Sequence, residues 1–111
     1  LNNLALAYQQ EKNPQALEYA EKAYQLTTDN PAILDTLGWL LVEQGNTSRG
    51  VPLLQKAAAL APQAPEVRYH FAVGLLKSGD KAAARKELEQ LVASGKNFSR
   101  LDDAKALLKQ L

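Results

Sequence analysis

The chain has 111 residues, of which 46% are hydrophobic, so it can bury one modest core and is too apolar to be a disordered chain. With 13 Lys and Arg against 12 Asp and Glu, it lacks the basic excess that indicates a nucleic-acid-binding surface. It contains no cysteine, which excludes disulfides, thiolate nucleophiles and zinc–thiolate sites.

Proline, asparagine and glycine mark the predicted helix ends in chain order. The pairs at 13–14 and 30–31 are Asn-Pro, which is typical of an N-cap followed by the first helical residue. Proline loses no hydrogen bond there, because that N–H has no partner within the helix. At 64–65 the same start lacks a capping side chain. Glycines at 45 and 79 predict helix C-termini, each followed by an Asn or Asp that caps the next helix.

Two further features fall within the predicted helices. Ser99 and Asp102 form the pattern of a capping box, with Ser99 as the N-cap of the last helix. Pro52 falls in the second turn of a predicted helix, where it removes a backbone hydrogen bond. It predicts either a tolerated kink or a change of curvature.

The predicted helices span residues 1–11, 14–27, 31–44, 47–60, 65–78, 81–94 and 99–110.

The sequence repeats with a period of 34 residues. Such a period is typical of stacked helix–turn–helix units, which bury their apolar faces against one another and together form a curved surface. We therefore predict an all-α solenoid of about three helical hairpins, at 1–30, 31–64 and 65–98, with a C-terminal capping helix at 99–111. The pairs that carry the period are Pro31 and Pro65, Leu37 and Phe71, Leu41 and Leu75, Gly45 and Gly79, and Leu54 and Leu88.

The second unit resembles the tetratricopeptide repeat at eight positions. Small residues at three of them would let the paired helices approach closely, while leucines would fill the space between. The eight positions are Leu34, Leu37, Gly38, Leu41, Gly50, Leu54, Ala57 and Pro62.

The other two units follow the repeat less closely. In the third unit, Arg68 stands where a large apolar residue is expected, Leu91 where a small one is, and Lys96 where proline would fall. The first unit is one residue shorter than the second at its inner turn. The resemblance covers about residues 1–98.

The two ends of the chain differ. Residues 99–111 form an amphipathic pattern with leucines on one side, which is typical of a helix that covers the last repeat. The chain begins at Leu1, inside a helical pattern, so we expect a fragment whose first helix exposes an edge toward further repeats or a second copy.

Several short runs extend the resemblance to one bacterial group. The chain is similar to the C-terminal part of the tetratricopeptide repeat lipoproteins of the PEP-CTERM/exosortase system, which are associated with exopolysaccharide genes. This similarity implies a parent protein in the bacterial cell envelope, either periplasmic or a lipoprotein of the outer membrane. The runs lie at 34–39, 52–56, 69–72, 77–80 and 106–111.

The resemblance also predicts which residues line the concave groove, because the first helix of each unit faces it. In some members a Lys and an Asn at fixed groove positions clamp a carboxylate; here Asp35 and Tyr69 stand in the place of the lysine, and Trp39 and Val73 in that of the asparagine, so these two units lack the clamp. In the second unit the positions are Asp35, Trp39, Val42 and Glu43; in the third, Tyr69, Val73, Leu76 and Lys77; in the first, Asn2, Leu6, Gln9 and Gln10.

Trp39 and His70 are the two most informative residues of this groove. Trp39 is the only tryptophan, and a large rigid aromatic residue suits the anchoring of a peptide; alternatively, it packs between repeats and contacts nothing else. His70, the only histidine, is expected beside Thr36 as a groove residue or as a solvated or hydrogen-bonded side chain. Without a second histidine or a cysteine it is a poor metal ligand, and no nucleophile motif accompanies it.

We therefore predict a non-enzymatic scaffold, without cofactor or metal, that binds a partner protein segment in its groove. Trp39 and Tyr69 would lie at the centre, and Asp35, Glu43, His70 and Lys77 would give specificity. No nucleic acid and no membrane insertion are expected. The alternative is a purely structural segment that mediates self-assembly or packs against further repeats.

Overall fold

A computed structural model describes residues 15–95 and 97–111 of the chain. Every regular element in this part is a helix, which confirms the predicted all-α class. The predicted helix at 1–11, with its groove positions, lies outside the described residues. The helices are α2 (Gln15–Leu26), α3 (Pro31–Glu43), α4 (Thr47–Leu60), α5 (Pro65–Lys77), α6 (Lys81–Ala93) and α7 (Leu101–Gln110).

The helix ends follow the predicted caps at the first two hairpins. Asn30 has extended backbone, and its side-chain oxygen accepts hydrogen bonds from the N–H groups of Ala32 and Ile33, at 2.9 and 3.3 Å. Gly45 and Gly79 have φ of 89° and 95°, in the left-handed region that glycine tolerates best. These local signals place the described helix boundaries between residues 15 and 93 within one residue of the prediction.

The capping box predicted at Ser99 is wrong. Helix α7 begins at Leu101, its N-cap is Arg100, and no side chain caps it. The Ser99 hydroxyl instead donates a hydrogen bond to Glu66 Oε1 at 2.6 Å, which ties the α6–α7 connection to the start of α5. The hydroxyl therefore serves a tertiary contact, and the local cap is not formed.

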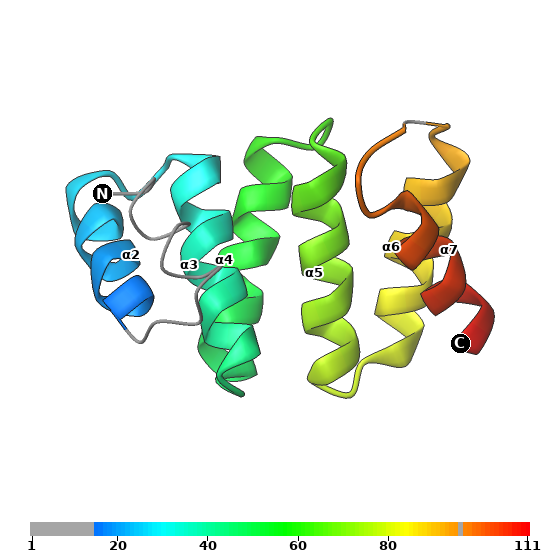
Figure 1. Ribbon diagram of the computed structural model, residues 1–111, viewed down its shortest axis with the longest axis horizontal. Helices are drawn as coiled ribbons and strands as arrows, with labels where there is room; N and C mark the ends of the chain where they lie inside the picture. Colours follow the sequence, from blue (N-terminus) through cyan, green and yellow to red (C-terminus); the bar gives the residue numbers. More distant parts are fainter. Residues whose placement is uncertain (1–14, 96) are drawn as a thin grey trace.

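The helices follow one another along the molecule in chain order, as Figure 1 shows. Helices α3 and α4 form one hairpin and α5 and α6 the next, while α4 packs against α5. Helix α2 packs against α3 at one end, and α7 packs against α6 at the other. The first helices of the two hairpins, α3 and α5, also contact each other, so they present a common surface.

Two glycines set the spacing within the α3–α4 hairpin. A Cβ atom on Gly38 would lie 2.8 Å from Leu54 Cγ and 3.0 Å from the Gly50 carbonyl oxygen. A Cβ atom on Gly50 would lie 2.8 Å from the Gly38 oxygen and 2.8 Å from Val42 Cγ2. Because atoms cannot approach so closely, only glycine at both positions allows this contact.

The structure shows how the chain accommodates Arg68, which departs from the repeat pattern, and Pro52, which falls inside a helix. The guanidinium group of Arg68 donates to Glu87 at 3.2 Å and to Gln90 at 3.0 Å, so a polar contact joins α5 to α6 where an apolar one is usual. Pro52 lies inside α4, which continues past it to Leu60. This continuity is compatible with both alternatives, a tolerated kink and a change of curvature.

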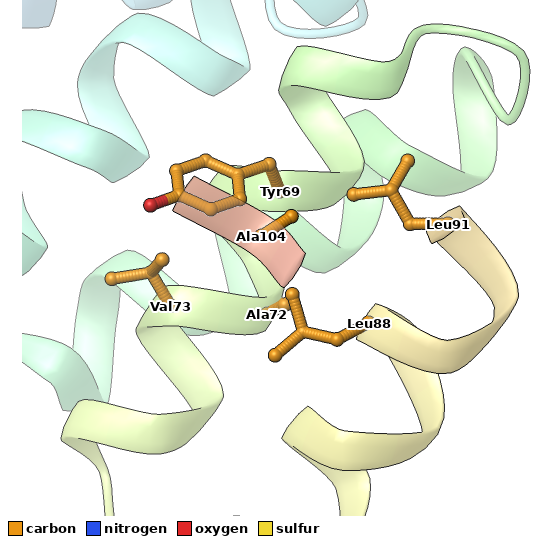
Figure 2. Packing of buried hydrophobic residues seen from close by; sticks show 6 residues of the cluster. All are labelled: Tyr69, Ala72, Val73, Leu88, Leu91 and Ala104. Carbon is orange, nitrogen blue, oxygen red and sulfur yellow. The ribbon is translucent and has the colours of Figure 1, made fainter. Parts of the chain in front are cut away.

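Helix α7 covers the end of the last hairpin, as predicted. Ala104 is completely buried, whereas Asp102 and Asp103 face solvent. Leu91, which replaces the usual small residue, is only 1% exposed and helps to fill the space beneath this helix. Figure 2 shows one cluster with side chains from three helices: Tyr69, Ala72 and Val73 of α5, Leu88 and Leu91 of α6, and Ala104 of α7.

Replacing Gly50 with alanine should lower the free energy of unfolding by about 1–3 kcal/mol, because backbone atoms of α3 block the new methyl group. Gly74→Ala is the matched control, since its Cβ would meet only side-chain ends, at 3.2 Å or more. Urea denaturation followed by circular dichroism measures both variants. An equal or smaller loss in Gly50→Ala would contradict the close-approach argument.

Candidate functional site

The residues predicted to line the groove come from two helices that contact each other. Helix α3 carries Asp35, Trp39, Val42 and Glu43, and α5 carries Tyr69, His70, Val73, Leu76 and Lys77. The positions predicted for the first unit lie outside the described residues. The structure places some of the remaining nine on a shared surface and others in the core.

A hydrogen bond between Asp35 and His70 connects the two helices at this surface. His70 Nδ1 lies 2.8 Å from Asp35 Oδ1 and 3.0 Å from Oδ2. An ionised carboxylate can only accept, so Nδ1 carries the hydrogen. Both side chains are mostly buried, with 17% of His70 and 16% of Asp35 exposed. The hydrogen bond therefore fixes the His70 side chain, which is not freely solvated.

Trp39 stacks on this histidine. The ring centroids lie 4.3 Å apart with an angle of 20° between the planes, so the indole packs on the imidazole face to face. Lys77 Nζ lies 6.0 Å from the centroid of the Trp39 ring, within the range of a cation–π contact. Trp39 also packs against two buried clusters, and it remains only partly buried.

Val42 is a core residue, which corrects its assignment to the groove. It is only 1% exposed, and it packs in one cluster with Leu54 and Phe71. The reason is the close approach of the helices at Gly50, which brings α4 over the face of α3 that carries Val42. A residue whose side chain has no access to solvent cannot contact a partner in this conformation.

Tyr69 and Val73 are also largely buried, each 9% exposed. The Tyr69 ring lies 6.3 Å from the Phe98 ring, centroid to centroid, and packs with Ala104 of α7. Helix α7, whose Ala104 lies beside Tyr69 in Figure 2, and Phe98 of the connection before it thus cover part of the surface that the sequence assigned to a ligand. Tyr69 belongs mainly to the core beneath α7.

The predicted residues that keep solvent access define what we call the Trp39 surface. It has an aromatic centre, with carboxylates and one ammonium group around it. Glu43 and Lys77 are exposed, and the rest are partly buried. The Trp39 surface consists of Asp35, Trp39, Glu43, His70, Leu76 and Lys77.

A pocket of about 580 Å³ opens beside this surface, between the first turns of α3 and α5 and the connection before α7. We call it the α3–α5 pocket. Thr36 and His70 both line it. Asp35, which the sequence assigned to the groove, lines it as well. The lining residues that the sequence analysis did not assign to the groove are Ala32, Ala64, Pro65, Glu66, Val67, Phe98 and Ser99.

The chemistry of the site suits binding. Among residues 15–95 and 97–111, no three His, Asp or Glu side chains are grouped as ligands of a metal ion. No helix in these ranges is long and apolar enough to cross a membrane.

The arrangement at Trp39 offers an apolar contact area with charged groups around it, which is suited to recognising another chain.

Stability should fall with rising pH in a way that depends on Tyr69. Burial raises the pKa of the Tyr69 phenol above its ordinary 10.0; Asp103 acts in the same direction and Arg100 opposes it. The unfolded chain therefore loses this proton first, so stability falls as pH rises from about 10 through the folded pKa. Between pH 9 and 11 the melting temperature of the wild type should fall relative to that of Tyr69→Phe; parallel curves would refute this.

The stacking predicts that His70 controls the environment of the only tryptophan. His70→Ala should red-shift Trp39 fluorescence and lower the free energy of unfolding by about 1–2 kcal/mol, because both the Asp35 hydrogen bond and the ring contact are lost. His70→Phe restores a ring without the hydrogen bond, so its emission should stay near that of wild type. Identical spectra for all three proteins would contradict the stacking.

Comparison with known proteins supports the repeat architecture. The Vi polysaccharide export protein VexE of Salmonella typhi is 35% identical over 94 residues, which cover 80% of this chain and 14% of that protein. The chain thus spans a small part of this relative.

Two solved structures of the type III secretion translocator chaperone SycD of Yersinia enterocolitica share the fold. They have TM-scores of 0.82 and 0.81 at 22% identity, and the second is described as an alternative dimer. The match covers 98% of this chain in both cases, and 79% and 86% of the SycD chains.

A family model described as tetratricopeptide repeat matches residues 41–111, which is more than half of the sequence. This range contains α4 to α7 and the end of α3. On this evidence, the chain belongs to the tetratricopeptide repeat family.

Proposed function

We propose that the Trp39 surface binds a segment of a partner protein. The family consists of non-enzymatic protein-interaction scaffolds, and this chain is one of them. The observation that carries the proposal is the position of Trp39: it is stacked on His70, yet it keeps part of its side chain accessible. An aromatic side chain fixed in this way loses little conformational entropy when a ligand packs on it.

The groups around Trp39 would select the segment. Glu43 is exposed, as is Lys77, whose ammonium group lies near the indole ring. Leu76 adds apolar area from α5. A segment with an apolar residue for Trp39 and charges complementary to Glu43 and Lys77 would fit this pattern, because charged groups at the rim favour one register over others.

We further propose that the parent protein takes part in polysaccharide export at the bacterial cell envelope. The relative VexE is a polysaccharide export protein and is 35% identical to this chain, which supports this setting. The resemblance to the PEP-CTERM/exosortase lipoproteins points to the same compartment and adds an association with exopolysaccharide genes. In this setting the repeat domain would hold another protein of the export machinery, and it would not act on the polysaccharide itself.

Trp39→Ala should abolish most partner capture by the full-length parent protein. A buried aromatic anchor contributes about 2 kcal/mol or more to binding, so we expect at least a thirtyfold weaker affinity. Proteins retained from an envelope extract of the source bacterium, identified by mass spectrometry and then titrated against the purified domain, give the measurement. Circular dichroism checks that the variant folds.

Leu60→Ala is the matched control, since it removes an exposed apolar side chain at the end of α4 that is not part of the Trp39 surface. It should leave capture unchanged. If Trp39→Ala instead changes only the oligomer size seen by light scattering, the self-assembly alternative holds. If both variants capture the partner as well as wild type does, the Trp39 surface is not the binding site.

A further inference from the structure

We infer that the α3–α5 pocket binds an arginine side chain of the partner segment; this inference rests on the function proposed above. The pocket adjoins the Trp39 surface and shares Asp35 and His70 with it. A segment that lies over Trp39 would therefore pass the mouth of the pocket. Its volume of about 580 Å³ is ample for one long side chain together with water.

The charged groups of the pocket favour a cation. Asp35 brings a carboxylate from α3, and Glu66 brings one from α5. None of the described lining residues is a lysine or an arginine. The nearby Arg100 guanidinium is bonded to Asp103 at 3.1 Å. The lining carries two negative charges with a neutral His70 and one with a protonated His70, so it remains negative in both states.

The helix ends at the pocket do not reverse this sign. The N-terminus of α3 is capped by the Asn30 side chain, whereas Ala64 leaves α5 without a side-chain cap. A helix N-terminus corresponds to about half a positive charge, which is less than either carboxylate. Glu66 lies in the first turn of α5 and offsets that partial charge directly. With a neutral His70, the two half charges leave about one net negative charge, so an anionic ligand would meet repulsion; with a protonated His70 the balance is close to zero.

The apolar part of the lining selects a side chain with a long stem. Ala64, Pro65, Val67 and Phe98 offer surface to methylene groups while the carboxylates bind the charged end. Arginine fits better than lysine for two reasons. Its guanidinium group has five donors in one plane, so it can bond carboxylates on two different helices. It is also more weakly hydrated than an ammonium group, and its flat face packs on an aromatic ring such as Phe98.

The test uses three blocked tripeptides, acetyl-Ala-Xaa-Ala-amide, in which Xaa is arginine, citrulline or lysine. Citrulline has nearly the shape of arginine without its charge. In titrations followed by NMR at low salt, the arginine peptide should shift the amide signals of Thr36, Val67 and Ser99. The citrulline peptide should bind roughly tenfold more weakly. Equal binding of citrulline or lysine, or no shift at these residues with the arginine peptide, would overturn the inference.

Glu66→Gln tests the second carboxylate and retains an oxygen that can accept from Ser99. It should weaken binding of the arginine peptide roughly two- to fivefold and reduce the salt dependence of binding. Asp102→Asn is the matched control, because Asp102 is likewise an acidic residue in the first turn of a helix but does not line the pocket. It should bind the arginine peptide as wild type does; equal weakening in both variants would overturn the inference.

These measurements separate the inference from the proposed function. If Trp39→Ala loses the captured partner while the arginine peptide fails to bind, only the arginine pocket is refuted. If the arginine peptide binds while Trp39→Ala still captures the partner, the Trp39 surface is refuted as the binding site. The inference that the pocket binds an arginine of that partner is then refuted as well, because it rests on the Trp39 surface being the binding site.

Discussion

The contact between Gly38 and Gly50 is the constraint on which the rest of the structure depends. With no side chain on either residue, α3 and α4 approach until backbone atoms meet, and Leu54 and Val42 fill the space on either side. This close packing holds the two amphipathic helices together as one hairpin. The next hairpin can then pack on α4, because Gly74 lets α5 approach Leu54 and Val51 in turn.

This spacing also determines what the surface presents. Because α4 lies close beneath both neighbours, α3 and α5 come into contact with each other. Asp35 and His70, which are 35 residues apart, can therefore form a hydrogen bond, and the imidazole ring can stack on Trp39. The same packing buries Val42. One close contact thus decides which residues of α3 reach a ligand and which stay in the core.

The sequence was sufficient for the parts of the fold that local rules decide. Asn30 caps the start of α3 and Gly45 lies just after its end, so both signals are local and the sequence pattern predicted both ends of this helix. Ser99 did not, because its hydroxyl is bonded to Glu66 in a different helix. The burial of Tyr69 depends on where α7 lies, and Phe98 belongs to a connection with no helical period. No periodicity could place these two residues against each other.

The Asp35–His70 pair has two effects that depend on each other. It holds the imidazole under Trp39, and it leaves a carboxylate at the wall of the α3–α5 pocket. A cation bound in the pocket would draw on the same carboxylate that orients His70. Occupation of the pocket would then alter how firmly the histidine holds Trp39, because hydrogen bonds to one acceptor are coupled. The two subsites would therefore be coupled through a single side chain that they share.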